Sequence, residues 1–230
     1  MPTHFTPEAL KFLRGLARHN DRAWFDPRKV IYEREIKAPM LAVIDEVNHA
    51  LADFAPDHVR QPQKAMMRIY RDTRFAADKR PYKTNVAAWW VRAGLEKTSG
   101  AGFYFHVSAT ETVIAAGIYM PTKEQLLAIR RHLAEHHAEF RAILANRKLR
   151  AKMSQLEGDQ LKRPPRGFCA DSPAIDLLLY QQWGVSATLP AETATEPSLV
   201  KQITTRFALA APLVHFLNAP IGSGGTQKSL

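Results

Sequence analysis

The sequence predicts an α+β fold: a single domain with a mainly antiparallel sheet and flanking helices. Both ends of the chain have apolar residues at helical spacing, whereas the middle is rich in aromatic and β-branched residues. The strands cluster along the chain instead of alternating with helices, which favours antiparallel pairing. We expect residues 1–218 to form this domain and residues 219–230, which end in GSGGTQKSL, to form a flexible tail.

The N-terminal region should form two helices. Thr6 precedes a proline and a glutamate, an order typical of a helix start because the hydroxyl caps the first free N–H groups. This helix should end near Asn20. A second helix should begin at Asp26 and end near Phe54, with a break or kink at Pro39, which has no backbone N–H.

The middle of the chain should supply the sheet. We expect strands over residues 64–71, 86–92, 103–108 and 112–119, and a loop over residues 98–102. Only three residues separate the last two strands, so they should form a hairpin.

The rest of the chain returns to helices. Thr122 should cap a long helix. A Pro/Gly loop, a short helix and a strand are expected next, over residues 161–172, 173–182 and 184–188. The last helix should begin at Pro197 and break at Pro212.

The composition is that of an ordinary globular chain, with 46% hydrophobic and 23% charged residues. It contains no run of about 18 apolar residues, so no membrane span is expected, and its first residues lack the pattern of a signal peptide. A single cysteine excludes an internal disulfide framework and a cysteine-only metal site. These observations favour a cytoplasmic location. The net charge of +10 favours anionic partners.

One stretch, RIYRDTRFAADKRPYKTN at residues 68–85, concentrates charge, with six basic and two acidic side chains. If its first part is a strand, side chains alternate between two faces. One face is polar and carries Arg68, Tyr70, Asp72 and Arg74. The other face begins apolar and then contains Arg71, which therefore needs an acidic or carbonyl partner.

The second part of this stretch cannot extend a central strand, because Pro81 lacks a donor. Residues 78–83 should instead form a turn that swings back over the strand end. The basic groups could then converge on an anion, since guanidinium forks bind phosphate and carboxylate. The candidate ligand-binding residues are Arg68, Arg71, Asp72, Arg74, Asp78, Lys79, Tyr82 and Lys83.

A purely structural interpretation competes with this one. Asp72 would pair with Arg68 and Arg74, and Asp78 would clamp the turn. Such networks are common on solvated strand faces. This interpretation leaves the excess of basic over acidic groups unexplained, and clustered unpaired charge is typical of binding sites.

Other motifs give weaker evidence of a functional site than residues 68–85 do. His132, Glu135 and His136 spell H-x-x-E-H, a zinc protease pattern, but the helical angle turns Glu135 to solvent and no third ligand is evident, so we expect no metal. His106 shares a strand face with Tyr104 and is either an acid/base group or structural. The lone Cys169 has no histidine nearby in sequence, and the standard nucleotide-binding loops are missing.

Four segments together resemble the family named domain of unknown function 2461. They are HNDRAWFDPRKVIYE, RIYRDTRFAADKRPYKTN, AAGIYMP and LKRPPRGFCADSPAIDLLL, in this order along the chain. The resemblance covers about residues 5–216 and implies a single soluble domain, mostly bacterial with fungal relatives. It gives no established activity, so it supplies no catalytic residues, and any reaction or cofactor stays unknown. His19 stands where the family tends to have an asparagine.

Three hypotheses for function follow. The first is a small phosphorylated or carboxylated ligand bound by the basic cluster at one sheet end, in a concave pocket. The second is a nucleic-acid-binding module, whose basic groups would spread over an exposed surface with aromatic residues. The third is a structural or protein-interaction domain in which the Arg–Asp motif only stabilises the fold. No membrane partner is expected.

Overall fold

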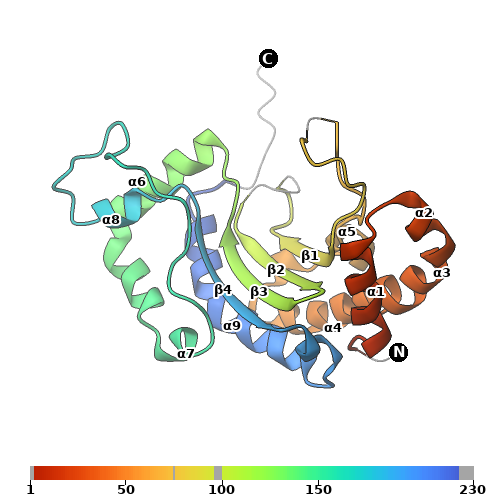
Figure 1. Ribbon diagram of the computed structural model, residues 1–230. Helices are drawn as coiled ribbons and strands as arrows, with labels where there is room; N and C mark the ends of the chain where they lie inside the picture. The colour runs from red at the N-terminus through yellow and green to blue at the C-terminus, as the bar shows by residue number, and fades with distance from the viewer. Residues whose placement is uncertain (1–2, 75, 96–99, 223–230) are drawn as a thin grey trace, which may run out of the picture. The chain divides into compact units, whose positions relative to one another are not determined.

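The structure is a computed structural model that describes residues 3–74, 76–95 and 100–222 (Figure 1). Its α+β architecture, with a four-stranded antiparallel sheet and flanking helices, confirms the predicted fold class. Residues 98–99 of the predicted loop and residues 223–230 of the predicted tail lie outside the described residues, and Gly102 already begins the strand after the loop.

The first helix confirms its predicted start. α1 (Pro7–Arg18) is capped by Thr6, whose Oγ1 accepts a hydrogen bond from the N–H of Ala9 at 3.2 Å. α2 (Arg22–Phe25) begins earlier than predicted, because Asp21 already caps it through the N–H of Trp24 at 2.8 Å. The helical path continues through η1 (Asp26–Arg28), α3 (Lys29–Ile31), η2 (Tyr32–Lys37) and α4 (Ala38–Phe54), followed by η3 (Pro56–His58) and α5 (Pro62–Ala65).

The helical path is not broken at Pro39. A π-helical segment, η2, lies directly before α4 and widens the backbone there. Such a turn accommodates a residue that has no N–H and whose ring would clash with the carbonyl four positions earlier. Ile36 and Met40 are fully buried on either side, so packing holds the path together through this irregularity.

The sheet contains β1 (Asn85–Val91), β2 (Gly102–Ser108), β3 (Glu111–Ile118) and β4 (Trp183–Pro190), in that order. Each of these strands lies within two residues of its predicted bounds. The predicted hairpin between β2 and β3 is confirmed. Its turn is closed by Ser108, whose Oγ accepts hydrogen bonds from the N–H groups of Thr110 and Glu111 at 3.2 and 3.1 Å.

The strand predicted at residues 64–71 is wrong. Residues up to Ala65 form the end of α5, and the segment that follows makes only isolated antiparallel bridges, Met66 with Ala88 and Tyr70 with Tyr82. Pro62 at the first helical position favours the helical turn, which local apolar alternation alone did not reveal.

The C-terminal helices are α6 (Lys123–Leu144), α7 (Arg147–Arg150), α8 (Ile175–Leu178) and α9 (Leu199–Asn218), with η4 (Ala191–Thr195) before α9. Thr122 and Gln125 form a capping box at the start of α6, as the predicted cap requires. α9 continues through Pro212, contrary to the predicted break. Leu213 and Leu217 are fully buried beyond the proline, and this burial outweighs the missing hydrogen bond.

The chain divides into two compact units, which we describe separately. Unit 1 contains residues 1–90, 104–114 and 188–205. Its core joins the N-terminal helices to β1. Asn48 of α4 donates a hydrogen bond to the carbonyl of Arg60 at 2.6 Å and accepts one from the indole N–H of Trp90 at 3.1 Å.

Unit 2 contains residues 91–103, 115–187 and 206–230. Phe103 packs on Phe207 of α9, with ring centroids 4.9 Å apart. The buried Arg130 of α6 donates hydrogen bonds to the carbonyls of Leu178 and Tyr180 at 2.9 and 3.0 Å, which fastens the segment after α8. The single domain predicted over residues 1–218 stays a prediction. None of the helices in the described ranges has the length and apolar character needed to cross a membrane.

Candidate functional site

The charged stretch forms an arm, which we call the basic arm and define as residues 68–83. It runs out and back between α5 and β1, drawn in gold in Figure 1. The N–H of Arg71 donates to the carbonyl of Pro81 at 2.9 Å, and the N–H of Lys83 donates to the carbonyl of Ile69 at 2.8 Å. The returning turn predicted for residues 78–83 is therefore confirmed. Phe75 lies outside the described residues.

The base of the arm is fastened to the N-terminal helices by Asn20. Its side-chain amide donates to the carbonyl of Tyr82 at 3.0 Å and accepts from the N–H of Tyr82, also at 3.0 Å. The amide thus pairs with the backbone as a neighbouring strand would. The ring of Tyr82 is buried and stacks on Phe25, with centroids 4.2 Å apart. Tyr82 therefore anchors the arm from beneath.

The exposed aromatic of the arm is Tyr70. Half of its surface is exposed, and its ring lies 5.4 Å from that of Tyr82. The polar face predicted for Arg68, Tyr70, Asp72 and Arg74 is exposed throughout, although the backbone there is not a regular strand. Ile69, on the opposite face, is buried.

Two Asp-x-Arg turns organise the charges. In the first, Asp72 accepts hydrogen bonds from the backbone N–H of Arg74 at 3.2 Å and from its Nε and Nη2 at 3.0 and 2.8 Å. In the second, Asp78 accepts from the N–H of Arg80 at 3.0 Å and from its Nη2 at 2.7 Å. Each aspartate closes a local turn and also receives the fork of the arginine two residues on.

Arg71 has the partners that its position requires. Its Nη1 lies 2.6 Å from Oδ2 of Asp78 and 3.3 Å from the carbonyl of Arg80. The prediction of an acidic or carbonyl partner is confirmed on both counts. Lys79 donates to the carbonyl of Thr73 at 3.0 Å, across the arm. Asp78 therefore serves two arginines and clamps the turn.

These pairs lower the pKa of both aspartates. The hydrogen bonds from the Arg74 side chain and backbone lower the pKa of Asp72 from 3.8 to about 2. The side chain and backbone of Arg80, followed by Arg71, hold the pKa of Asp78 still further below its ordinary value. Both groups are therefore ionised at neutral pH and already engaged with arginines.

The remaining positive charge sits at the surface. The arm has six basic and two acidic side chains, a net charge of +4. Arg68 is exposed and makes no hydrogen bond or ion pair within the part of the chain that the structure describes. The side chains of Arg74 and Arg80 are 77% and 56% exposed even in their ion pairs. Lys83 is half-buried near the base.

Sequence reasoning missed two residues of this arrangement. Arg80 repeats the Asp72–Arg74 spacing after Asp78, and this repeat was a signal available in the sequence. Asn20 carried no such signal, because its pairing with Tyr82 joins positions 62 residues apart.

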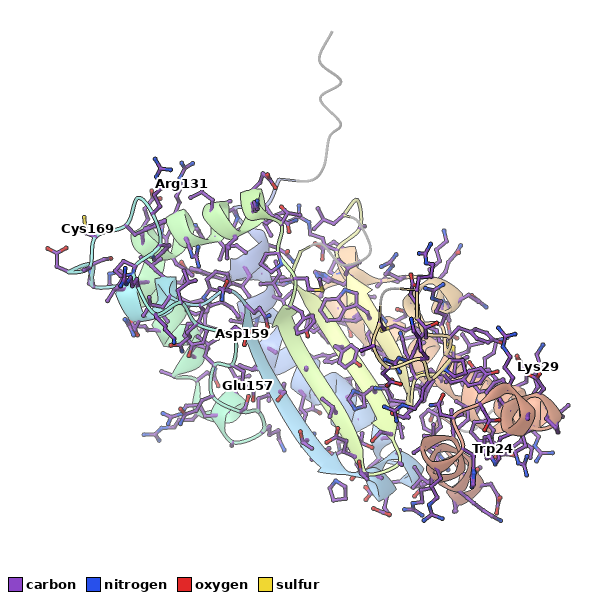
Figure 2. The ribbon with its side chains drawn as sticks, turned by 45° about the horizontal axis from the view of Figure 1, so that its top comes forward. Trp24, Lys29, Arg131, Glu157, Asp159 and Cys169 are labelled. Atoms are coloured by element: carbon purple, nitrogen blue, oxygen red, sulfur yellow. The ribbon has the colours of Figure 1, made fainter. Side chains whose placement is uncertain are left out.

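The other motifs are not part of the basic arm. Trp24 and Lys29 lie on the N-terminal helices, and the exposed Cys169 lies on the loop before α8 (Figure 2). His132 and His136 have ring centroids 4.5 Å apart, while the Glu135 side chain is largely exposed, as its helical angle predicted. Across residues 3–74, 76–95 and 100–222, no group of three or more His, Cys, Asp or Glu side chains is placed to hold a metal ion.

Comparison with known families decides the relationship of this chain. The model of the family described as conserved hypothetical protein DUF2461 matches residues 8–216. The chain belongs to the DUF2461 family. This match spans the basic arm, both Asp-x-Arg turns and Asn20, and it confirms the resemblance inferred from the four segments. Searches of curated proteins and of solved structures gave no match.

Replacing Asn20 with alanine should destabilise the protein. The change leaves the N–H and carbonyl of Tyr82 without their partner, and an unpaired part-buried pair costs about 1–3 kcal/mol in the free energy of unfolding. Urea denaturation measures this loss. The control is Arg18→Ala, at the exposed end of α1, which should change the free energy by less than about 0.5 kcal/mol. Equal effects of the two changes would contradict an anchoring role for Asn20.

The Asp72–Arg74 pair should be visible in acid titration. Its stabilisation is present above the ordinary pKa of 3.8 and is lost as the pH falls through the lowered pKa of about 2. Carboxyl-carbon NMR of Asp72 should show this low midpoint, and Arg74→Ala should move it back toward 3.8. A wild-type midpoint near 3.8, unchanged by Arg74→Ala, would show that the fork is not formed in solution.

Proposed function

We propose that the chain binds an anionic ligand, with phosphate or carboxylate groups, through the basic arm. The observation that carries this proposal is the exposed guanidinium of Arg68, which has no hydrogen-bond or ion-pair partner among the described residues and lies in a segment of net charge +4. Asp72 and Asp78 are both engaged, yet the arm keeps a net charge of +4 and exposes most of its basic groups. A field of this kind raises the local concentration of anions.

The arginines of the arm suit such a ligand. A guanidinium has five N–H donors in one plane, and Arg71 and Arg80 use only part of theirs on Asp78. Arg68 directs none of its donors to another described residue. Because the two Asp-x-Arg turns hold the side chains of Arg74 and Arg80, a phosphate or carboxylate would meet partly ordered donors there rather than free chains.

The proposed ligand class is a small molecule bearing phosphate or carboxylate groups. Such a ligand needs only two or three convergent donors, and the arm offers Arg68 and the unpaired donors of Arg71 and Arg80 within one short segment. No reaction follows from the arm alone, and we propose binding rather than catalysis there.

A single-stranded nucleic acid is the second candidate, and one observation favours it. Tyr70 presents an aromatic ring that is half exposed, next in sequence to Arg71 and two residues from Arg68. Stacking of a base on an exposed ring beside arginines is the common mode of single-strand binding. The arm is exposed instead of enclosed in a pocket, and an exposed surface suits an extended ligand.

Removing Arg68 should weaken anion binding. We expect pyrophosphate, a sugar phosphate or a dicarboxylate to raise the melting temperature at low salt, and Arg68→Ala to lower the affinity by about tenfold, the value of one charge-assisted hydrogen bond. Isothermal titration calorimetry measures the affinity. The matched control is Arg150→Ala, which removes the same charge from an exposed position in unit 2 and should have little effect.

The same titrations distinguish the two candidates. An oligonucleotide bound across several phosphates should lose affinity steeply with salt, and Tyr70→Ala should cost it about 1–3 kcal/mol of binding free energy. A small ligand should show a shallow salt dependence and no response to Tyr70→Ala. If neither ligand class binds, or if Arg68→Ala and Arg150→Ala weaken binding equally, the proposed function is wrong.

A further inference from the structure

A second cluster of polar side chains lies on the sheet of unit 1. Tyr104 and His106 lie two residues apart on β2 and so share one face, and Glu111 is the first residue of β3. The Oη of Tyr104 lies 3.1 Å from Nδ1 of His106. On the other side of the imidazole, Nε2 lies 3.6 Å from Oε1 of Glu111. The phenol of Tyr104, the imidazole of His106 and the carboxylate of Glu111 therefore lie in a row, with the imidazole in the middle.

The hairpin turn places Glu111 beside His106. Ser108 Oγ accepts hydrogen bonds from the N–H groups of Thr110 and Glu111, and it donates one to the carbonyl of Glu111 at 3.2 Å. These bonds fix the first residue of β3 against the end of β2. The backbone of Glu111 is thus held by the turn, and its carboxylate, which is 42% exposed, extends from this position toward the imidazole.

The order of groups decides where the imidazole proton lies. A carboxylate only accepts hydrogen bonds, so the proton of the neutral imidazole is favoured on Nε2, facing Glu111. Nδ1 is then the acceptor for the O–H of Tyr104. Burial of His106, whose side chain is 13% exposed, lowers its pKa more than Glu111 raises it. The imidazole is therefore neutral at pH 7 and can accept a proton.

The indole ring of Trp89 lies beside the phenol of Tyr104. The ring of Trp89 on β1 lies 6.0 Å from that of Tyr104, at an interplanar angle of 55°. The indole N–H of Trp89 is buried and has no hydrogen-bond acceptor among the described residues. A buried donor of this kind is uncommon in native structures.

We propose that Tyr104, His106 and Glu111 form a proton relay that makes the Tyr104 oxygen a nucleophile toward a ring-bearing acyl compound, such as an aryl ester. The oxygen forms a bond to the acyl carbon while the bond to the leaving group breaks. The phenol proton passes to Nδ1 of His106 and then to the leaving group. Tyr104 is the catalytic residue, His106 the base and Glu111 a positioning residue.

The arrangement follows the logic of a nucleophile, a base and an orienting carboxylate. Trp89 supplies the surface against which the ring of the compound packs. This proposal does not rest on anion binding by the arm, since none of the four residues belongs to residues 68–83.

Labelling with benzenesulfonyl fluoride tests the relay directly. The reagent has an aromatic ring and an electrophilic sulfur, and a tyrosine oxygen displaces fluoride from it to leave a stable sulfonate ester. Peptide mass spectrometry gives the rate at each tyrosine of the full chain. Tyr119, which is 67% exposed, is the internal control. We expect Tyr104 to react at least about tenfold faster than Tyr119 although it is less exposed, because a positioned base assists it.

Two variants separate catalysis from structure. His106→Gln should bring the rate at Tyr104 down to that of Tyr119 or below, and Glu111→Gln should lower it partway. In the wild type, nitrogen NMR of His106 should show the proton on Nε2, and Glu111→Gln should shift the imidazole toward a mixture of tautomers. If a variant fails to fold, the wild-type comparison still decides. A Tyr104 rate no higher than that of Tyr119, or one unchanged in a folded His106→Gln variant, would overturn the proposal.

Discussion

The charged surface depends on two hydrogen bonds that the side-chain amide of Asn20 makes to the backbone of Tyr82. The basic arm has isolated bridges instead of a continuous ladder, so its backbone is held by few hydrogen bonds of its own. Asn20 supplies a donor and an acceptor to Tyr82, and Phe25 stacks beneath the same residue. Through these contacts, the position of the arm is set by the N-terminal helices.

The proposed function builds on the contacts that the structural interpretation of the arm predicts. The Asp-x-Arg turns at Asp72 and Asp78 stabilise the arm locally, as the structural interpretation requires. They also leave a surplus of exposed basic groups, since two carboxylates face six cations. Arginines that are already ordered lose less side-chain freedom when an anion binds, and Arg68, which is unpaired within the described ranges, keeps all of its donors available. Under the proposed function, local stability and anion binding would use the same contacts.

Much of the fold could be predicted, because its signals are local. The caps at Thr6 and Thr122 and the hairpin after Ser108 each depend on residues within a few positions. The error at Pro212 has a different origin: burial of residues beyond it, which no local pattern reveals. The roles of Asn20 and of Glu111 beside His106 were likewise missed, because they arise when separate elements or strands meet. The partner of Arg71 was predictable as a physical need, whereas its identity was not.

Mapping an anion onto individual residues tests the central claim most directly. Backbone amide NMR of the full chain, titrated with pyrophosphate at low salt, should show saturable shifts concentrated in residues 68–83 and at Asn20, with one common dissociation constant. These shifts should be lost in Arg68→Ala but retained in Arg150→Ala. Shifts that are spread evenly over exposed basic residues, or that saturate elsewhere in the chain while the arm stays unchanged, would contradict the account.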